Sequence, residues 1–334
     1  MAHSGVVVVG GSAGSHPALL SLVAGLPADL SAAVLVVIHV GAQASSRLPR
    51  MLSRGGRLPA AHATDGAPLR VGEIMVAPPG FHLTVEEKSV RLDSGPRVNR
   101  VRPAVDVLFD SAARTHGAQA TAVVLSGTMD DGAVGAALVS VAGGQVLVED
   151  PDQAPHGSMP RAALSAAPGA VAFPAAELAA AVVRALDRPV AEPGLEAVGD
   201  QHGRAAMTQS SDPGFLAEDE TRLTRLACPD CGGVLAEISL PSISYFRCHV
   251  GHQFGLKTLA AAQAEASETK LWSAVAAMEE QAVVLRHLAE HEPGDVPGDR
   301  RNGERRAGYA RRAQEISELM GMIRAHLRRD RSSW

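Results

Sequence analysis

Short apolar runs alternate with helix-spaced segments over the first half of this 334-residue chain. Between the first two runs, Ala18, Leu19, Leu22 and Val23 recur at the spacing of one helix face. The clearest runs are rich in β-branched residues and comprise Val6–Val9, Ala33–Ile38, Glu73–Ala77, Ala122–Ser126 and Gln145–Glu149. Near-continuous apolar strands are typical of parallel sheets that helices cover on both faces. The sequence therefore predicts an α/β fold with a doubly wound, mostly parallel sheet.

This pattern fades after Arg188, where Pro, Gly, Asp, Gln and Ser dominate. Such a composition is typical of a flexible linker. A segment with clustered Cys and His residues follows, and helical spacing resumes beyond it. We therefore expect a main domain over residues 1–187, a linker over 188–224, a small Cys/His module over 225–258 and a helical hairpin over 259–334.

The C-terminal segment carries two apolar series at steps of three and four residues. The first comprises Leu271, Val275, Met278, Ala282, Leu285 and Ala289, and the second comprises Tyr309, Ala313, Ile316, Met320, Ile323 and Leu327. A Pro/Gly/Asp-rich break, Glu292–Gly303, separates them. This pattern predicts a helical hairpin or coiled coil with one apolar seam per helix. Packing of the two helices on each other accounts for the seams, and self-association through them is an alternative.

Composition and charge restrict the class of protein. The net charge is −5, which gives no overall reason to expect nucleic-acid binding. No signal peptide is visible and no stretch reaches the roughly 20 apolar residues of a membrane span, so we expect no membrane insertion. The three cysteines lie between Cys228 and Cys248, which is a poor disulfide framework. These features favour a reducing, cytoplasmic location.

A glycine-rich turn follows the first predicted strand. Gly10-Gly11-Ser12-Ala13-Gly14 has the G-x-S-x-G spacing of a nucleophile elbow, which lifts a serine above the sheet. Backbone N–H groups at the start of the next helix, including that of Ala13, could stabilise an oxyanion. A phosphate-binding turn is an alternative, but G-x-G-x-x-G spacing is absent and the second strand ends in His39 rather than an acid. A purely structural turn is the other alternative.

Two further polar residues follow strand ends. His39 comes after the second predicted strand, and Asp131 lies in the loop after the Ala122–Ser126 run. The carboxyl ends of parallel strands meet at one edge of a sheet. A serine nucleophile needs a base, and a histidine base needs a carboxylate to fix its tautomer. Ser12, His39 and Asp131 therefore form a candidate catalytic triad.

These segments resemble the chemotaxis protein-glutamate methylesterases, the CheB family. The Ser12 turn, Ile38-His39 and Gly127–Gly132 are similar to that family's three catalytic segments. Further similar stretches are Val76–His82, the Asn-Arg-x-Arg-Pro-x-Val-Asp run within Val98–Phe109, and Ser158–Ala163. The resemblance spans roughly residues 5 to 185.

The resemblance implies a serine hydrolase that removes methyl esters from glutamate side chains of chemoreceptor-type proteins, with no cofactor for catalysis. Some relatives also deamidate glutamine. Ser12 would attack the carbonyl, His39 would act as base and then acid, and Asp131 would orient His39. The family's oxyanion donor maps onto the backbone N–H of Thr128. The sequence departs from the family pattern at Ala13, Thr128 and Met129.

The resemblance also bears on partners and control. It implies a methylated receptor or other signalling protein as substrate, with a methyltransferase or response regulator as a further partner. The well-studied family architecture has an N-terminal receiver domain, whereas this sequence opens on the first predicted strand. We therefore expect control to come from the C-terminal part or from a separate protein. A non-catalytic methylesterase-like scaffold in a signalling complex is the alternative.

The Cys/His module has the composition of a zinc site. Cys228-Pro229-Asp230-Cys231 is a C-x-x-C knuckle, and Cys248 precedes His249 and His252. Three Cys and one His make a closed, structural Zn²⁺ site. We favour His252 as the fourth ligand because His249 directly follows Cys248. A redox C-x-x-C is the alternative, but it would need a thioredoxin-like context. The module also resembles the zinc-ribbon extensions of some methylesterase-like proteins.

Overall fold

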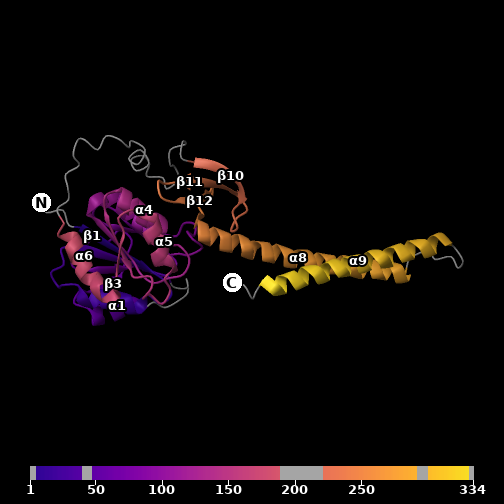
Figure 1. The fold of residues 1–334 in the computed structure, drawn as a ribbon, viewed down its shortest axis with the longest axis horizontal. Coiled ribbons are helices and arrows are strands. Elements are labelled where there is room, and N and C mark those ends of the chain that lie inside the picture. Colours follow the sequence, from indigo (N-terminus) through magenta and orange to yellow (C-terminus); the bar gives the residue numbers. More distant parts are fainter. Residues whose placement is uncertain (1–4, 40–46, 189–220, 292–299, 331–334) are drawn as a thin grey trace. The chain divides into compact units, whose positions relative to one another are not determined.

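The computed structural model describes residues 5–39, 47–188, 221–291 and 300–330 (Figure 1). The chain divides into two compact units, Met1–Leu259 and Ala260–Trp334. The predicted linker lies almost entirely outside the described residues. In the described part, none of the helices combines the length and the apolar character needed to cross a membrane.

The first unit is built on a seven-stranded sheet with the order β3-β4-β2-β1-β7-β8-β9. Every neighbouring pair is parallel, which confirms the predicted α/β sheet. The strands are β1 (Gly5–Gly11), β2 (Ala32–Ile38), β3 (Ala60–His62), β4 (Ile74–Val76), β7 (Ala120–Val124), β8 (Gln145–Glu149) and β9 (Val171–Phe173). The central strands β1, β2 and β7 are buried along almost their whole length, as their continuous apolar sequences require.

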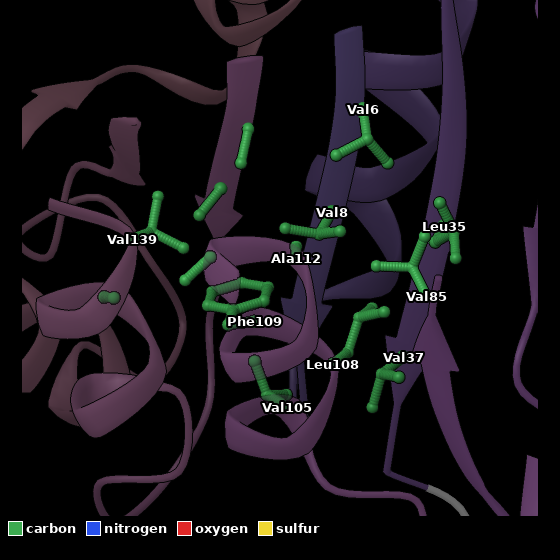
Figure 2. Close-up of a cluster of buried hydrophobic side chains, with 14 of the residues drawn as sticks. Val6, Val8, Leu35, Val37, Val85, Val105, Leu108, Phe109, Ala112 and Val139 are labelled. Carbon is green, nitrogen blue, oxygen red and sulfur yellow. The ribbon is translucent and has the colours of Figure 1, made fainter. Parts of the chain in front are cut away.

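Helices cover both faces of this sheet. One face carries α1 (His16–Gly25), α2 (Leu48–Gly55) and α6 (Leu178–Leu186), and the other carries α3 (Val105–His116), α4 (Ala133–Val141) and α5 (Ser158–Ala166). A short antiparallel hairpin, β5 (His82–Val85) and β6 (Val90–Asp93), packs beside α3. Figure 2 shows Leu108 and Phe109 of α3 among the side chains of β1 and β2.

Close packing fixes the position of α3. A Cβ atom at Gly10, near the end of β1, would overlap the side chain of Val105, the first residue of α3. A Cβ at Gly135 in α4 would lie 2.5 Å from the Cβ of Phe109. Helices approach this closely only where small residues leave room. The N-terminus of α3 is thereby held against the carboxyl end of β1.

The described residues from 221 to 255 form a small antiparallel sheet of four strands, β10 (Thr221–Ala227), β11 (Val234–Ser239), β12 (Ser244–Cys248) and β13 (Gln253–Gly255). Helix α8 (Leu256–His291) begins directly after β13.

The second unit consists of most of α8 together with α9 (Arg300–Asp330). The two helices are antiparallel. Arg306, near the start of α9, contacts the Ala289 carbonyl near the end of α8, and Arg324, farther along α9, contacts Glu279. This arrangement confirms the predicted hairpin. Ala313, Met320 and Leu327 of the predicted seam are buried at heptad spacing. Helix α9 begins at Arg300, inside the predicted break.

Candidate active site

Ser12 lies at the turn between β1 and α1. Its backbone N–H donates to the Ser126 carbonyl at 2.9 Å, and its own carbonyl accepts from the Ser15 hydroxyl at 2.6 Å. Its side chain is half-buried. A Cβ added at Gly127 would lie 2.9 Å from the Ser12 Cβ and would overlap Met159. Because residue 127 is a glycine, Ser12 can lie close to the loop that follows β7.

His39 follows β2 at the same edge of the sheet. Its N–H donates to the Gly11 carbonyl at 3.1 Å, so its backbone lies beside the residue that precedes Ser12. Its Nε2 lies 2.7 Å from Asp131 Oδ2. Nε2–H is therefore the donor to the carboxylate, and Nδ1 is the nitrogen left to accept a proton. Among the described residues, no hydrogen bond joins Ser12 Oγ to His39.

Asp131 is buried and accepts four hydrogen bonds. Oδ2 accepts from the Val105 N–H at 2.7 Å as well as from His39, and Oδ1 accepts from Asn99 Nδ2 at 2.8 Å and the Asp106 N–H at 3.2 Å. Burial raises the pKa of Asp131, but the bond and charge of His39, with the Val105 and Asn99 donors, outweigh it and hold the pKa below its usual value. The carboxylate also caps the N-terminus of α3, where the helix dipole favours a negative charge.

Asn99 and Asp106 complete this network and were not predicted as site residues. Asn99 Nδ2 also donates to Asp106 Oδ2 at 2.7 Å, and Asp106 Oδ1 accepts from the N–H groups of Gly132 and Gly135 at 2.9 and 2.8 Å. Burial, together with the charge of Asp131, raises the pKa of Asp106 well above its usual value. The signal in the sequence was the run from Val98 to Phe109, which the family resemblance marked without assigning roles.

Of the predicted oxyanion donors, Ala13 directly follows Ser12, and Thr128 directly follows Gly127. Ala13 and Thr128 are both exposed, and neither N–H donates a hydrogen bond to any described residue. The Ser126 hydroxyl donates a hydrogen bond to the Ala13 carbonyl at 2.8 Å. Met129, beside Thr128, has a positive φ of 64°, a conformation rare for a non-glycine residue. Its carbonyl accepts from the Ser158 hydroxyl at 2.8 Å, which helps to hold the loop in this shape.

The structure also brings together Cys228, Cys231, Cys248 and His252, whose ligand atoms all lie within 4.8 Å of one another. Sγ of Cys248 lies 3.6 Å from Sγ of Cys231 and 3.5 Å from Nδ1 of His252. Tetrahedral zinc with ordinary bond lengths places two sulfurs about 3.8 Å apart and a sulfur and a nitrogen about 3.5 Å apart. These donors fit a zinc ion. His249 lies over Gly233, where an added Cβ would meet its ring, and it is outside this cluster.

Comparison with known proteins covers the first part of the chain. A family model described as CheB methylesterase matches residues 7–182. The chain is 39% identical over 159 residues, 48% of its length and 47% of the relative's, to "Protein-glutamate methylesterase/protein-glutamine glutaminase 2" of Anaeromyxobacter dehalogenans. It is 33% identical over 161 residues, 48% of its length and 83% of the relative's, to a "Putative protein-glutamate methylesterase/protein-glutamine glutaminase" of Leptospira interrogans.

A solved structure of the same family also matches this chain. The "Thermotoga maritima CheB methylesterase catalytic domain" matches with a TM-score of 0.51 and 30% identity, and the match covers 54% of this chain and 98% of that one. The chain spans about half the length of several curated relatives that it matches. The family model covers more than half of the present chain. This chain belongs to the CheB methylesterase family.

Proposed function

We propose that this chain is a serine hydrolase that removes methyl esters from glutamate side chains of chemoreceptor-type proteins. The observation that carries the proposal is the 2.7 Å contact between His39 and the buried Asp131, at the sheet edge where Ser12 follows β1. A histidine held by a carboxylate beside a serine is the constellation needed for nucleophilic catalysis. Membership of the CheB family supports an ester of a protein side chain as the substrate.

The mechanism follows from the contacts of these residues. His39 Nδ1 accepts the proton of Ser12 as Oγ attacks the ester carbonyl, and Asp131 stabilises the imidazolium that forms. The backbone N–H groups of Ala13 and Thr128 donate to the oxyanion. Collapse of the tetrahedral intermediate breaks the C–O bond to the methoxy group, which leaves as methanol with the proton from His39. Water, deprotonated by His39, then attacks the acyl-enzyme and releases the glutamate carboxylate and Ser12.

The same chemistry extends to amides. The curated relatives carry the names of both a protein-glutamate methylesterase and a protein-glutamine glutaminase. Attack of Ser12 on a glutamine side chain would release ammonia in place of methanol, with the same acyl-enzyme in both reactions. We therefore propose deamidation as a second activity of the same site.

We further propose that Cys228, Cys231, Cys248 and His252 hold a structural Zn²⁺ ion, as in a zinc ribbon. Three thiolates and one imidazole fill all four tetrahedral positions, so the ion supplies cross-linking rather than catalysis. A sheet of four short strands has little core of its own, and metal binding would contribute the missing folding free energy. Elemental analysis of the purified chain, with Cys231→Ser as the depleted variant, tests this assignment.

The remaining assignments are proposals of the same kind. We place the chain in the cytoplasm, because its three cysteines are free thiols in an arrangement suited to a metal. Its division into a catalytic domain (1–187), a linker (188–224), a metal module (225–258) and a helical hairpin (259–334) rests on the sequence pattern. The partners proposed are a methylated receptor and a methyltransferase or response regulator, with self-association through α8 and α9. Binding of nucleic acid and insertion into a membrane form no part of this proposal.

Methanol release from a methylated receptor fragment tests the enzymatic proposal. We expect release by the wild type and none above background by Ser12→Ala. The matched control is Ser21→Ala on the adjoining α1, where the hydroxyl makes a weak 3.4 Å contact with the Ala175 carbonyl. Retained activity in Ser12→Ala would contradict the proposed nucleophile. Absence of release by a folded wild type would favour the scaffold alternative.

A further inference from the structure

The small antiparallel sheet packs directly on the α/β part of the first unit. Ile238 and Tyr245 form a buried cluster with Val134 of α4. A second cluster joins Leu240 and Ile243 to alanines of α4 and α5. The Ser242 hydroxyl also donates to the Ala166 carbonyl at the end of α5. Apolar contact and a hydrogen bond therefore fix this sheet against α4, which follows the loop that carries Asp131, and against α5.

Strand β13 of this sheet reaches the triad through Asn99. The Asn99 N–H donates to the Gln253 carbonyl at 2.7 Å, and Asn99 Oδ1 accepts from the Gly255 N–H at 2.7 Å. The amide nitrogen of the same side chain donates to Asp131 and Asp106. Asn99 is buried and has a φ of 51°, in the left-handed region that Asn tolerates better than most residues. One side chain thus connects the backbone of β13 to the carboxylate that orients His39.

A second connection runs through Asp130, the neighbour of Asp131. Its carboxylate accepts from the N–H groups of Lys257 and Thr258 at 2.8 and 3.2 Å and from the Thr258 hydroxyl. Asp130 therefore caps the first turn of α8. A Cβ at Gly255 would lie 2.5 Å from Asp130 Oδ2, so β13 can approach this closely only with glycine at position 255. The loop that carries Asn99 is therefore bound to β13, and the loop that carries Asp131 is bound, through Asp130, to the start of α8.

The Cys/His cluster determines where β13 begins. Cys248 ends β12, and His252 directly precedes β13. Backbone bonds from Cys248 N–H to the His252 carbonyl at 3.0 Å and from Gly251 N–H to the Cys248 carbonyl at 2.9 Å close this turn. An ion bound to Cys248 and His252 would hold both ends of the turn to the Cys228–Cys231 knuckle. In the same knuckle, Asp230 pairs with Arg100 at 3.7 Å, next to Asn99.

We infer that the metal-binding module is a positioning element of the catalytic centre, in which an ion at the Cys/His cluster holds β13, β13 holds Asn99, and Asn99 holds Asp131. The inference rests on the proposed esterase function for its kinetic consequence. Asn99 is a positioning residue, because it acts on the substrate only through Asp131 and His39. Loss of the ion is expected to lower kcat more than it changes KM, since the contacts at risk orient the base.

The experiment uses the full chain loaded with zinc and then stripped with a chelator. NMR follows the two side-chain amide protons of Asn99, both donated to carboxylates, and the His39 proton at Nε2. We expect zinc removal to shift or broaden these signals and to lower kcat at least tenfold, with KM within twofold. Restoring zinc should reverse both effects.

Two variants separate this coupling from unfolding of the module. Gly255→Ala should keep its zinc but show the shifted Asn99 signals and the lower kcat, because its Cβ displaces Asp130. Val234→Ala, at a 55% exposed position of the same sheet, should keep zinc, signals and kcat. Unchanged signals and kcat after verified zinc loss, or in Gly255→Ala, would overturn the inference. If the loaded wild type releases no methanol, the esterase proposal fails, and the Asn99 signals alone decide the coupling.

Discussion

Replacing Asp131 by asparagine tests how the carboxylate supports the base. All four groups around the Asp131 oxygens are donors, with two on each oxygen. An asparagine keeps one acceptor oxygen and places an NH₂ group against the other two donors. With the NH₂ in the place of Oδ2, His39 keeps a contact through its other tautomer and only the bond from the Val105 N–H is lost, so the loss is about 1.5–3 kcal/mol, the contribution of one hydrogen bond to a charged group. Relief of the repulsion between Asp131 and Asp106 offsets part of this loss.

The effect on catalysis should exceed the effect on folding. Where the amide NH₂ faces Nε2, this nitrogen must accept a hydrogen bond, so the imidazole carries its proton on Nδ1. Nδ1 can then no longer accept the proton of Ser12. The same change in a serine-protease triad lowers kcat about 10⁴-fold, and a fall of about 10³–10⁴-fold corresponds to about 4–5.5 kcal/mol. We expect Asp131→Asn to show this fall in kcat for methanol release, with KM changed far less.

The control is Asp152→Asn, because its side chain is 84% exposed and pairs with Arg161 on the surface. It should retain wild-type kcat and thermal midpoint. Thermal unfolding of each variant separates loss of fold from loss of base. A folded Asp131→Asn with kcat within about tenfold of the wild type would refute the assigned role of Asp131.

Three further predictions concern Asp106, Gly127 and His82. Asp106→Ala should lower the unfolding free energy by about 2–6 kcal/mol, because it leaves the buried N–H groups of Gly132 and Gly135 unpaired; equal stabilities of the variant and the wild type in denaturant unfolding would contradict this. Gly127→Ala should cost about 1–3 kcal/mol and lower kcat, because its Cβ would overlap Met159 and crowd Ser12; wild-type kinetics would contradict this. Burial lowers the pKa of His82 below 6.5, so the contribution of this histidine to stability is complete above pH 6.5 and declines at lower pH, where the unfolded state takes up a proton. The unfolding free energy of the wild type should therefore fall between pH 8 and pH 5, and it should fall less in a His82→Gln variant. An equal fall in the two proteins would contradict this.

The central sheet was predictable because its strands are buried on both faces. Continuous apolar runs at β1, β2 and β7 leave little alternative to parallel strands between helices. The edge strands β3 and β9 have three residues each and are largely not buried, so hydrophobic pattern gave no signal for them. The strands of the small sheet were not predicted individually, because the cysteine pattern indicates a metal site rather than a strand register.

The triad candidates came from the rule that strand ends meet at one edge, and the structure places Ser12, His39 and Asp131 at such ends. The network behind Asp131 could not come from that rule. Asn99 and Gly255 are 156 residues apart in sequence, and no periodicity relates the turn that carries Asn99 to β13. Buried polar networks depend on which tertiary neighbours supply the donors, and local sequence does not encode that.

Covalent labelling identifies the nucleophile of the site. The full chain would react with a fluorophosphonate, and mass spectrometry of its peptides would locate the adduct. We expect an adduct on Ser12, no such adduct in Ser12→Ala, and labelling in His39→Gln slowed by about 10³-fold or more. Labelling at another residue, or equal rates in the wild type and His39→Gln, would contradict the assignment of Ser12 as a nucleophile activated by His39.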